Sequence, residues 1–483
     1  MNDVLERLRL LRAGDAPTHG GRVLSYVYDS GLDELDELAD AAARLARPLN
    51  GLDPTVFPSI AAMERDVIGF ARRMLHGGAS VTGTVTSGGT ESCLLAVKTA
   101  RDLWRRSHAE PGAVVRPRLV APATAHAAFI KAAQLFDLDF DAVPCSADGV
   151  VAAADVISRM GDDVALVVVS APNYPTGALD PITEVAAAAS ARGISCHVDS
   201  CFGGFVLPWW PVPAAWDFRV PGVTSISADL HKFGYAPKGV SVLLQRGRRR
   251  HRAQFFATTA WAGYPVVNPT LLGSRSASPL AAAWAITQHL GVDGYRALTE
   301  SIHRVAQEIR EAVERIPGLR VIGDPTGPAI ALGADPGVPD SQRVDPHHLA
   351  DAMVRYGWKI QHQPGLTQSD GVRIAHSAHL TLTPVLERRV TEFVDALAAA
   401  SGDVRGRAPS DPRALLAALR VLGYGEGGRV PGPSAAWRLL RLAGAGSVSA
   451  EQPMATLMAL IERLPRPVAE ALLTELLARM SEP

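Results

Sequence analysis

Residues 81–104, VTGTVTSGGTESCLLAVKTARDLW, contain a β-branched run, two adjacent glycines and a long amphipathic stretch. Valine and threonine alternate through the first part as they do in strands, and the apolar residues after the glycines have helical spacing. A strand that turns through glycine into a helix is a building unit of α/β proteins. The segment therefore predicts one strand–turn–helix unit of a largely parallel sheet.

The same alternation continues on both sides of this segment. SIAAMERDVIGFARRML before it and AHAAFIKAAQLF after it have helical spacing, whereas RPRLVAPA, ALVVVSAP and ISCHVDS are short apolar runs. Short runs rich in β-branched residues are typical of strands that are buried on both faces. We therefore expect a large α/β domain over residues 59–290.

The chain changes character after residue 290. A long amphipathic stretch, YRALTESIHRVAQEIREAVERI, precedes the strand-like runs GLRVIG and PAIALGA and the helix-like LERRVTEFVDALAAA. This order predicts a smaller α+β domain over residues 291–400. Residues 401–483 begin with the polar segment SGDVRGRAPSDPR and end in two helix-like runs, so we expect a linker and a helical tail.

Charge and cysteine content narrow the functions that this chain can have. The 48 Lys and Arg residues balance 49 Asp and Glu residues, which argues against a nucleic-acid partner. The four cysteines have no metal-ligand spacing, so we expect reduced thiols and no metal site. No run approaches the roughly 18 apolar residues of a membrane span, and the N-terminus is charged. We expect a cytoplasmic protein without a signal peptide or membrane span.

The basic run QRGRRRHR, residues 245–252, is the densest cluster of positive charge. It is short and follows the strand-like GVSVLL. We expect a solvated loop here, which could also make peripheral contact with an anionic lipid headgroup.

Gly88 and Gly89 lie between the expected strand and helix of the opening segment. Glycines let the backbone approach a ligand closely, and the free amides at the start of the helix suit a phosphate group. Alternatively, the glycines only form the turn and Thr90 caps the helix. The local sequence leaves both interpretations open.

Asp199 ends the apolar run ISCHVD, at the edge where α/β sheets bind their ligands. A carboxylate there is costly unless it is paired, for example with a protonated ring nitrogen. The alternative is a structural aspartate that caps the turn before two glycines.

Lys232 follows the apolar run VTSISADLH, so we expect partial burial to lower its pKa and leave the amine able to attack a carbonyl. A surface lysine would be the ordinary alternative. However, a phosphate-binding turn, a buried aspartate and then a His-Lys pair is the order of groups that binds pyridoxal phosphate. Together they predict this cofactor.

Four segments also resemble a known family. TSGGTES, HVDSCFGGF, DFRVPGVTSISADLHKFGYAPKG and WAGYPVVNPTLLGSR resemble blocks of sphingosine-1-phosphate lyases, within the group II pyridoxal-phosphate decarboxylases of aminotransferase-like fold type I. The resemblance runs from about residue 20 to 400. It implies a seven-stranded, mostly parallel sheet and a homodimer, in which an N-terminal arm, residues 1–58, reaches the active site of the partner.

The resemblance implies specific roles around the cofactor. Lys232 would hold it as a Schiff base, Asp199 would keep its ring nitrogen protonated, and His126 would stack on the ring. A helix-start histidine that faces solvent is the alternative for His126. The cofactor phosphate would be bound by Ser87, Gly88, Gly89, Thr90 and His231, with Gly273 and Ser274 of the partner subunit.

On the substrate side, the resemblance implies that Lys238 binds a phosphate and that Tyr28, Asn50, Asp53 and Tyr235 line the site, with Tyr28 also catalytic. Two positions depart from the family. Asp53 stands where the family has histidine, and Tyr26 stands where it has a small residue. The base that removes the substrate's hydroxyl proton is left open between Lys232 and a tyrosine.

The expected reaction is cleavage of the Cα–Cβ bond of a phosphorylated amino-alcohol lipid, a sphingoid base, into a fatty aldehyde and phosphoethanolamine. One alternative is decarboxylation of an amino acid, against which Lys238 argues because such a substrate carries no phosphate. The other is a catalytically silent binder of pyridoxal phosphate, against which Lys232, Asp199 and His126 argue.

Overall fold

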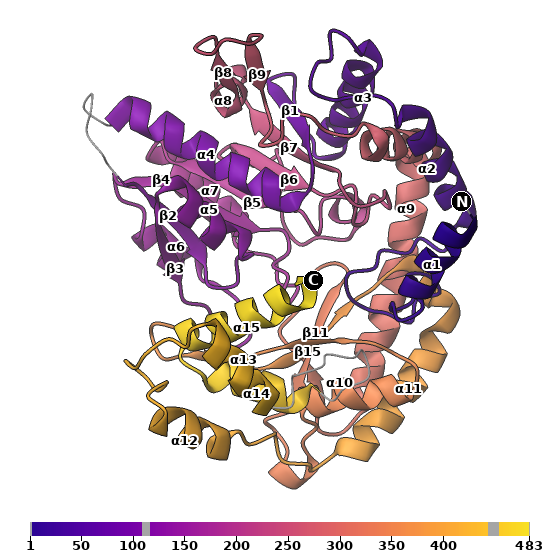
Figure 1. Cartoon of the computed structure of the whole chain (residues 1–483), viewed down its shortest axis with the longest axis vertical. Coiled ribbons are helices and arrows are strands. Elements are labelled where there is room, and N and C mark those ends of the chain that lie inside the picture. Colours follow the sequence, from indigo (N-terminus) through magenta and orange to yellow (C-terminus); the bar gives the residue numbers. More distant parts are fainter. Residues whose placement is uncertain (1, 109–115, 443–453, 483) are drawn as a thin grey trace.

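The computed structural model describes residues 2–108, 116–442 and 454–482, and Figure 1 shows a large domain, a smaller domain and a helical tail beside the smaller one. The large domain contains the predicted seven-stranded sheet. Only β7 is antiparallel to its neighbours, so the sheet is mostly parallel. Across the sheet, the strands are β1 (Val81–Thr86), β7 (Ser241–Arg246), β6 (Ser225–Ala228), β5 (Ser195–Asp199), β4 (Val164–Ser170), β2 (Arg118–Pro122) and β3 (Asp139–Val143).

Helices cover both faces of this sheet, as the sequence predicted. On one face, α4 (Gly89–His108) and α5 (Ala128–Phe136) share a core with Leu166 and Val168 of β4. On the other, α3 (Pro58–Met74) and α7 (Ile182–Ala191) share a core with Val167 and Val169. Because successive β4 side chains enter two different cores, the strand is apolar throughout instead of alternating.

The smaller domain is built on an antiparallel sheet in the order β10 (Leu319–Val321), β11 (Ala329–Ala334), β15 (Ser377–Thr381) and β12 (Gln361–Gln363). It also contains α10 (Pro346–Arg355) and α11 (Val390–Val404). The helix α9 (Ser278–Glu314) joins the two domains. It runs through the predicted boundary at residue 290 and is interrupted only at Gly291, whose φ of 55° is left-handed.

The N-terminal arm lies against its own small domain. It contains α1 (Asn2–Arg12) and α2 (Asp33–Ala46), and α2 lies beside α9 (Figure 1). Between these helices, Val23 pairs with Lys359, and the Thr381 amide donates to the Leu24 carbonyl at 2.8 Å. These backbone hydrogen bonds fasten the arm to the small-domain sheet.

The tail contains α12 (Arg413–Val421), α13 (Pro433–Leu442), α14 (Ala455–Arg463) and α15 (Arg466–Ser481). These helices share a separate small core that includes Leu419, Leu440, Leu460 and Leu472. Among the helices of the described ranges, none combines the length and apolarity that a bilayer crossing requires.

The expectation of a solvated loop for the basic run is wrong. Residues Arg248–Gln254 form the helix α8, which precedes the hairpin of β8 (Phe256–Thr258) and β9 (Val266–Asn268). Arg250 donates to the Ser195 hydroxyl at 2.9 Å, and Arg246 donates to the Val223 carbonyl at 2.8 Å. Partners distant in sequence therefore bind two of these charges to the protein itself.

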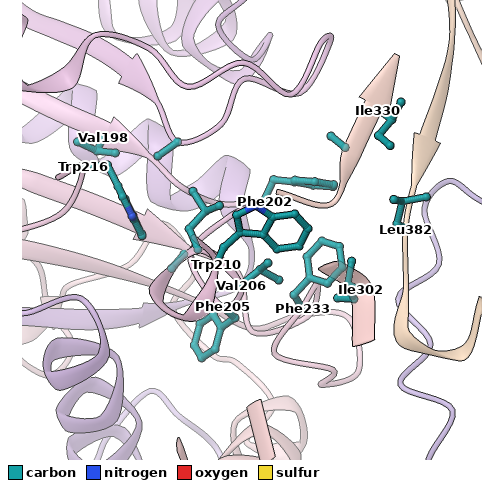
Figure 2. Close-up of a cluster of buried hydrophobic side chains, with 14 of the residues drawn as sticks. Val198, Phe202, Phe205, Val206, Trp210, Trp216, Phe233, Ile302, Ile330 and Leu382 are labelled. Carbon is teal, nitrogen blue, oxygen red and sulfur yellow. The ribbon is translucent and has the colours of Figure 1, made fainter. Parts of the chain in front are cut away.

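A single hydrophobic cluster connects the two domains, as Figure 2 shows. Val198 of β5 and Phe202 come from the large domain, whereas Ile330 of β11 and Leu382 come from the small domain. Phe233, the residue after Lys232, is fully buried within it. The cluster holds the segment that carries Lys232 against both domains.

Candidate active site

A cavity of about 560 Å³ lies at the carboxyl ends of β1, β4, β5 and β6. This is the edge where α/β sheets bind ligands, because loops and helix starts leave free polar groups there. Ser170, Asp199 and Ser227 lie level with one another in the strand register. The side chains that line the cavity include Tyr26, Tyr28, Ser87, Gly88, Gly89, Thr90, His126, Tyr174, Asp199, Phe202, Asp229, His231, Lys232 and Gln361.

Neighbouring side chains pack so closely against Gly88 and Gly89 that no Cβ atom fits at either position without displacing them. A Cβ atom at Gly89 would lie 2.6 Å from Asp229 Oδ2 and 2.8 Å from Cys201 Sγ, and one at Gly88 would lie 3.1 Å from the His231 ring. Because side chains are excluded, the start of α4 presents backbone amides to the cavity, where Ser87 and Thr90 are exposed. This is the arrangement that favours a phosphate group.

Glu91, to which the sequence analysis assigned no role, holds this turn in place. Its Oε2 accepts the Ser87 amide at 2.6 Å, and its Oε1 accepts the Leu271 amide at 2.6 Å. One buried carboxylate therefore joins the phosphate-binding turn to the loop that contains Gly273 and Ser274.

Asp199 and His126 both lie at the cavity, as predicted. Asp199 ends β5 and accepts hydrogen bonds through Oδ1 from the Cys201 amide at 3.1 Å and the Ser227 hydroxyl at 3.4 Å. His126 accepts the Ala128 amide through Nδ1 at 3.2 Å. It is thus a helix-start histidine, and it also lines the cavity.

Lys232 is paired with a carboxylate that the sequence analysis quoted but did not assign. Its Nζ lies 3.0 Å from Asp229 Oδ2, and His231 Nε2 lies 3.4 Å from the same oxygen. Ser241 donates to Asp229 Oδ1 at 2.6 Å. Asp229 is almost fully buried, with 1% of its side chain exposed.

This pairing overturns the expected pKa of the lysine. Burial lowers the pKa of Lys232, but the adjacent Asp229 carboxylate outweighs it and raises that pKa well above its usual range. Burial likewise opposes ionisation of Asp229, yet the charges of Lys232 and His231 hold its pKa far below the usual range. Without a bound cofactor, the lysine is therefore a partly buried ammonium ion and the expectation of a lowered pKa is wrong.

Lys238 is exposed and does not itself line the cavity, but it lies beside Tyr28, which does. Its Nζ donates to the His231 carbonyl at 2.8 Å and lies 4.4 Å from the centre of the Tyr28 ring, which lines the cavity. Burial, followed by the charge of Lys232, lowers the pKa of Lys238 to about 8. Burial raises the pKa of Tyr28, so its hydroxyl keeps its proton.

A hydrogen-bonded chain of three side chains crosses the cavity. The Tyr174 hydroxyl donates to Gln361 Oε1 at 2.6 Å, and Gln361 Nε2 donates to the Tyr26 hydroxyl at 2.8 Å. Burial raises the pKa of Tyr174 to about 12. Tyr26, one of the two departures from the family pattern, therefore faces the site, with a left-handed φ of 61°.

Sequence reasoning missed Tyr174 and Gln361. Tyr174 follows β4, whose carboxyl end adjoins Asp199, so its position was a usable signal. Gln361 lies in the small domain, and nothing in its local sequence indicated that it reaches this cavity.

Several predicted residues do not line the cavity of this chain. Tyr235 is buried against Phe233 and Tyr295, at ring-centre distances of 6.4 and 6.3 Å. Asn50 donates to the Ser274 hydroxyl at 3.2 Å, and Asp53 accepts from the Thr55 amide at 2.8 Å. Asn50 and Ser274, both predicted to serve the partner's site, therefore lie together on the surface.

The cavity residues fit pyridoxal phosphate. Three groups meet at the cavity: the Gly88–Gly89 turn, which leaves no room for side chains, the strand-end carboxylate of Asp199 and the amine of Lys232. They match the cofactor's phosphate, ring nitrogen and aldehyde, respectively.

Comparisons with known proteins agree with this fit. Residues 32–332 match the pyridoxal-dependent decarboxylase conserved domain. Over 444 residues the chain is 34% identical to the sphingosine-1-phosphate lyase of Oryza sativa, covering 89% of this chain and 77% of the rice protein. Sphingosine-1-phosphate lyase 1 of Rattus norvegicus is 36% identical over 392 residues, covering 80% of this chain and 65% of the rat protein.

Solved structures give the same assignment. The sphingosine-1-phosphate lyase of Burkholderia pseudomallei superposes with a TM-score of 0.76 and 34% identity, covering 87% of this chain and 94% of that chain. A glutamate decarboxylase of Lactobacillus brevis, at 23% identity and a TM-score of 0.73, shares the fold. The chain belongs to the sphingosine-1-phosphate lyase family of pyridoxal-dependent decarboxylases and is a lyase that uses pyridoxal phosphate.

Proposed function

We propose that this enzyme cleaves the Cα–Cβ bond of a phosphorylated long-chain sphingoid base, releasing a fatty aldehyde and phosphoethanolamine. The observation that carries the proposal is the position of Lys238, a second amine beside the cavity wall at Tyr28. A phosphate on the substrate would form a charge-assisted hydrogen bond with this amine. The named activity of the relatives in rice, rat and Burkholderia supports the same substrate.

When bound, pyridoxal phosphate supplies an electron sink for negative charge that develops at the substrate's Cα. Gly88, Gly89 and His231 would hold its phosphate, and Asp199 would hold a proton at the ring nitrogen. Lys232 would bond its aldehyde carbon. The remaining steps depend on how the side chains of this protein orient the substrate and move its hydroxyl proton.

We propose that Lys232 Nζ removes the β-hydroxyl proton, a role that requires its amine to be neutral in the cofactor-loaded enzyme, unlike the ammonium ion of the cofactor-free protein. Burial raises the pKa of Tyr28 and of Tyr174, so both hydroxyls keep their protons and act as hydrogen-bond donors. Asp229, 3.0 Å from Lys232 Nζ, fixes the direction of the amine. The chain of Tyr174, Gln361 and Tyr26 orients the substrate across the cavity.

We further propose that the active enzyme is a homodimer. Asn50 and Ser274 lie together outside the cavity, and the exposed Leu271 and Leu272 adjoin Ser274 in sequence. Exposed leucines beside polar residues that are predicted to complete an active site suit an interface between two copies.

One experiment tests the substrate. The enzyme loaded with pyridoxal phosphate is incubated with sphingosine 1-phosphate, unphosphorylated sphinganine or a set of amino acids, and aldehyde and carbon dioxide are measured. We expect the wild-type enzyme to release aldehyde from the phosphorylated base. Lys238→Ala should release much less, whereas the control Lys131→Ala, which removes an exposed lysine of α5, should release as much as wild type. Carbon dioxide from an amino acid, without aldehyde, would instead establish a decarboxylase.

A further inference from the structure

A second cluster of ionisable side chains lies outside the active site, where the tail meets the small domain. It brings together His347 of α10, His376 before β15 and Glu462 of α14. Glu462 Oε1 lies 3.1 Å from His347 Nε2 and 3.5 Å from His376 Nδ1. The side chains are 3%, 20% and 4% exposed for His347, His376 and Glu462, so the cluster is nearly enclosed.

These spacings suit a transition-metal ion. Tetrahedral zinc binds imidazole nitrogen and carboxylate oxygen at about 2.0–2.2 Å, which separates neighbouring ligand atoms by about 3.4 Å. The two separations at Glu462 Oε1, 3.1 and 3.5 Å, lie on either side of this value. Two histidines and one glutamate are also a known zinc ligand set, with water in the fourth position.

The residues around the cluster orient the two imidazoles as metal ligands require. His376 Nε2 lies 2.8 Å from Asp345 Oδ2, so a proton on Nε2 leaves the Nδ1 lone pair facing Glu462. His347 Nδ1 lies 3.3 Å from His362 Nδ1, and His362 Nε2 lies 3.4 Å from Asp351 Oδ1. Carboxylate–histidine pairs of this kind set the tautomer and basicity of metal ligands.

Glu462 is itself held in place by two donors. Arg373 donates to its Oε2 at 2.6 Å, and the Gly365 amide donates to its Oε1 at 2.9 Å. Gly365 directly precedes β13 (Leu366–Thr367), and Arg373 begins β14 (Arg373–Ile374). A lone pair on His376 Nδ1 that faces a carboxylate oxygen is repelled unless a proton or a cation lies between them.

We propose that His347 Nε2, His376 Nδ1 and Glu462 Oε1 bind one divalent ion of the zinc class, which fastens the tail to the small domain. The cysteine spacing had predicted no metal site, but this ligand set uses no cysteine and comes from three separate segments. The other group of suitable donors in the described ranges, Cys93, Asp199 and Cys201, lies in the active site. There, a hydrogen bond with Cys93 and burial raise the pKa of Cys201, so the thiol keeps its proton.

The site would act at two points of the structure. Asp351 accepts the amides of Met454 and Ala455 at 2.8 and 3.1 Å, so the start of α14 is already anchored to α10, and the ion would anchor its other end. In β12, Gln361 faces the active-site cavity while its neighbour His362 faces the cluster. One short strand therefore joins the proposed ion to the wall of the substrate cavity.

The test measures metal binding directly. Tag-free enzyme loaded with pyridoxal phosphate is stripped with EDTA and titrated calorimetrically with ZnCl₂, and bound zinc is counted by mass spectrometry. We expect one ion per chain and no binding of Mg²⁺, which prefers oxygen ligands. Glu462→Gln and His376→Asn should weaken zinc binding at least 100-fold, and Asp345→Asn should weaken it about 10- to 100-fold.

His19→Asn is the matched control, because His19 forms an exposed pair with Asp36 at 3.1 Å and should not affect binding. Limited proteolysis gives a second readout: EDTA should speed cleavage of the tail in the wild-type protein but not in Glu462→Gln. Asp345→Asn leaves all three ligands in place, so its effect on zinc binding tests the proposal even if a ligand variant does not fold. Absence of zinc binding, or equal binding by wild type, Glu462→Gln and His376→Asn, would overturn the proposal.

Discussion

Replacing Asp229 with Asn should destabilise the cofactor-free protein, because it leaves Lys232 as a partly buried cation without its counter-charge. Asparagine keeps the shape and can still bond Ser241, so the change removes mainly the negative charge. Removing one partner of a buried ion pair costs about 3–5 kcal/mol. We expect the lower end, about 3 kcal/mol, because 21% of the Lys232 side chain stays exposed.

The assay is urea unfolding of the cofactor-free protein at pH 7, and the control is Asp102→Asn. Asp102 also lies 3.0 Å from a lysine, Lys98, and accepts from Arg101 at 2.6 Å, but its side chain is 21% exposed whereas that of Asp229 is 1% exposed. We expect a cost near 1 kcal/mol or less there, because solvent screens that pair. If Asp229→Asn costs no more than Asp102→Asn, the buried ion pair is not the reason for the raised pKa of Lys232.

The stability contributed by the Asp229–Lys232 pair should depend on pH. Because the pKa of Asp229 is depressed in the folded protein, its stabilising contribution is complete above about pH 4 and is lost as the pH falls further. Because the pKa of Lys232 is raised, its contribution is complete below about pH 10 and is lost at higher pH. The stability difference between wild type and Asp229→Asn should therefore be greatest near neutral pH, shrink below about pH 4, and shrink at alkaline pH as Lys232 of the variant, whose pKa burial alone lowers, loses its proton.

Three further substitutions test the site. Gly89→Ala should abolish retention of pyridoxal phosphate, because its methyl group would lie 2.6 Å from Asp229 Oδ2. The control Gly78→Ala, with open space around it, should bind the cofactor normally. Retention is measured by visible absorbance, and normal absorbance in Gly89→Ala would contradict the role of the glycine turn. Lys238→Ala should lower kcat/KM for a phosphorylated substrate about 10- to 100-fold by raising KM, because it removes a charge-assisted contact worth about 1.5–3 kcal/mol. The cofactor absorbance should stay unchanged. Asp53→His should improve turnover of sphingosine 1-phosphate. In the proposed homodimer the N-terminal arm would bring Asp53 to the partner's site, where its carboxylate, whose pKa hydrogen bonds from Thr55 lower, repels a phosphate. Loss of activity on a cationic amine would instead show that Asp53 binds positive charge.

Local sequence was enough to predict the large domain. β4 is almost entirely apolar because both of its faces are buried, and this pattern is visible without knowing which strands are neighbours. Because ligands bind at strand ends in such sheets, the same pattern placed Asp199 at the cavity. The glycine pair was predicted as a turn or a phosphate site, and only the distances to Asp229, Cys201 and His231 showed why no side chain fits there.

The protonation of Lys232 could not be predicted from its apolar surroundings alone. Burial acts on a single residue and can be inferred from sequence, but the sign of the shift depends on whether a counter-charge lies within a few ångströms. The turn after β6 brings Asp229 to 3.0 Å from the amine. For the same reason, the arginines of the basic run were expected in solvent, although Arg246 and Arg250 have partners on distant strands.

The sequence by itself therefore determined the α/β architecture, the cofactor and the order of its ligands, because these depend on periodicity and on residue types at strand ends. Only the tertiary structure decided which groups meet across the chain. Gln361 reaches Tyr174 and Tyr26 from the small domain, and Glu462 reaches His347 and His376 from the tail. Hydrogen bonds and charge interactions act over a few ångströms in space, and separation along the sequence does not encode that distance.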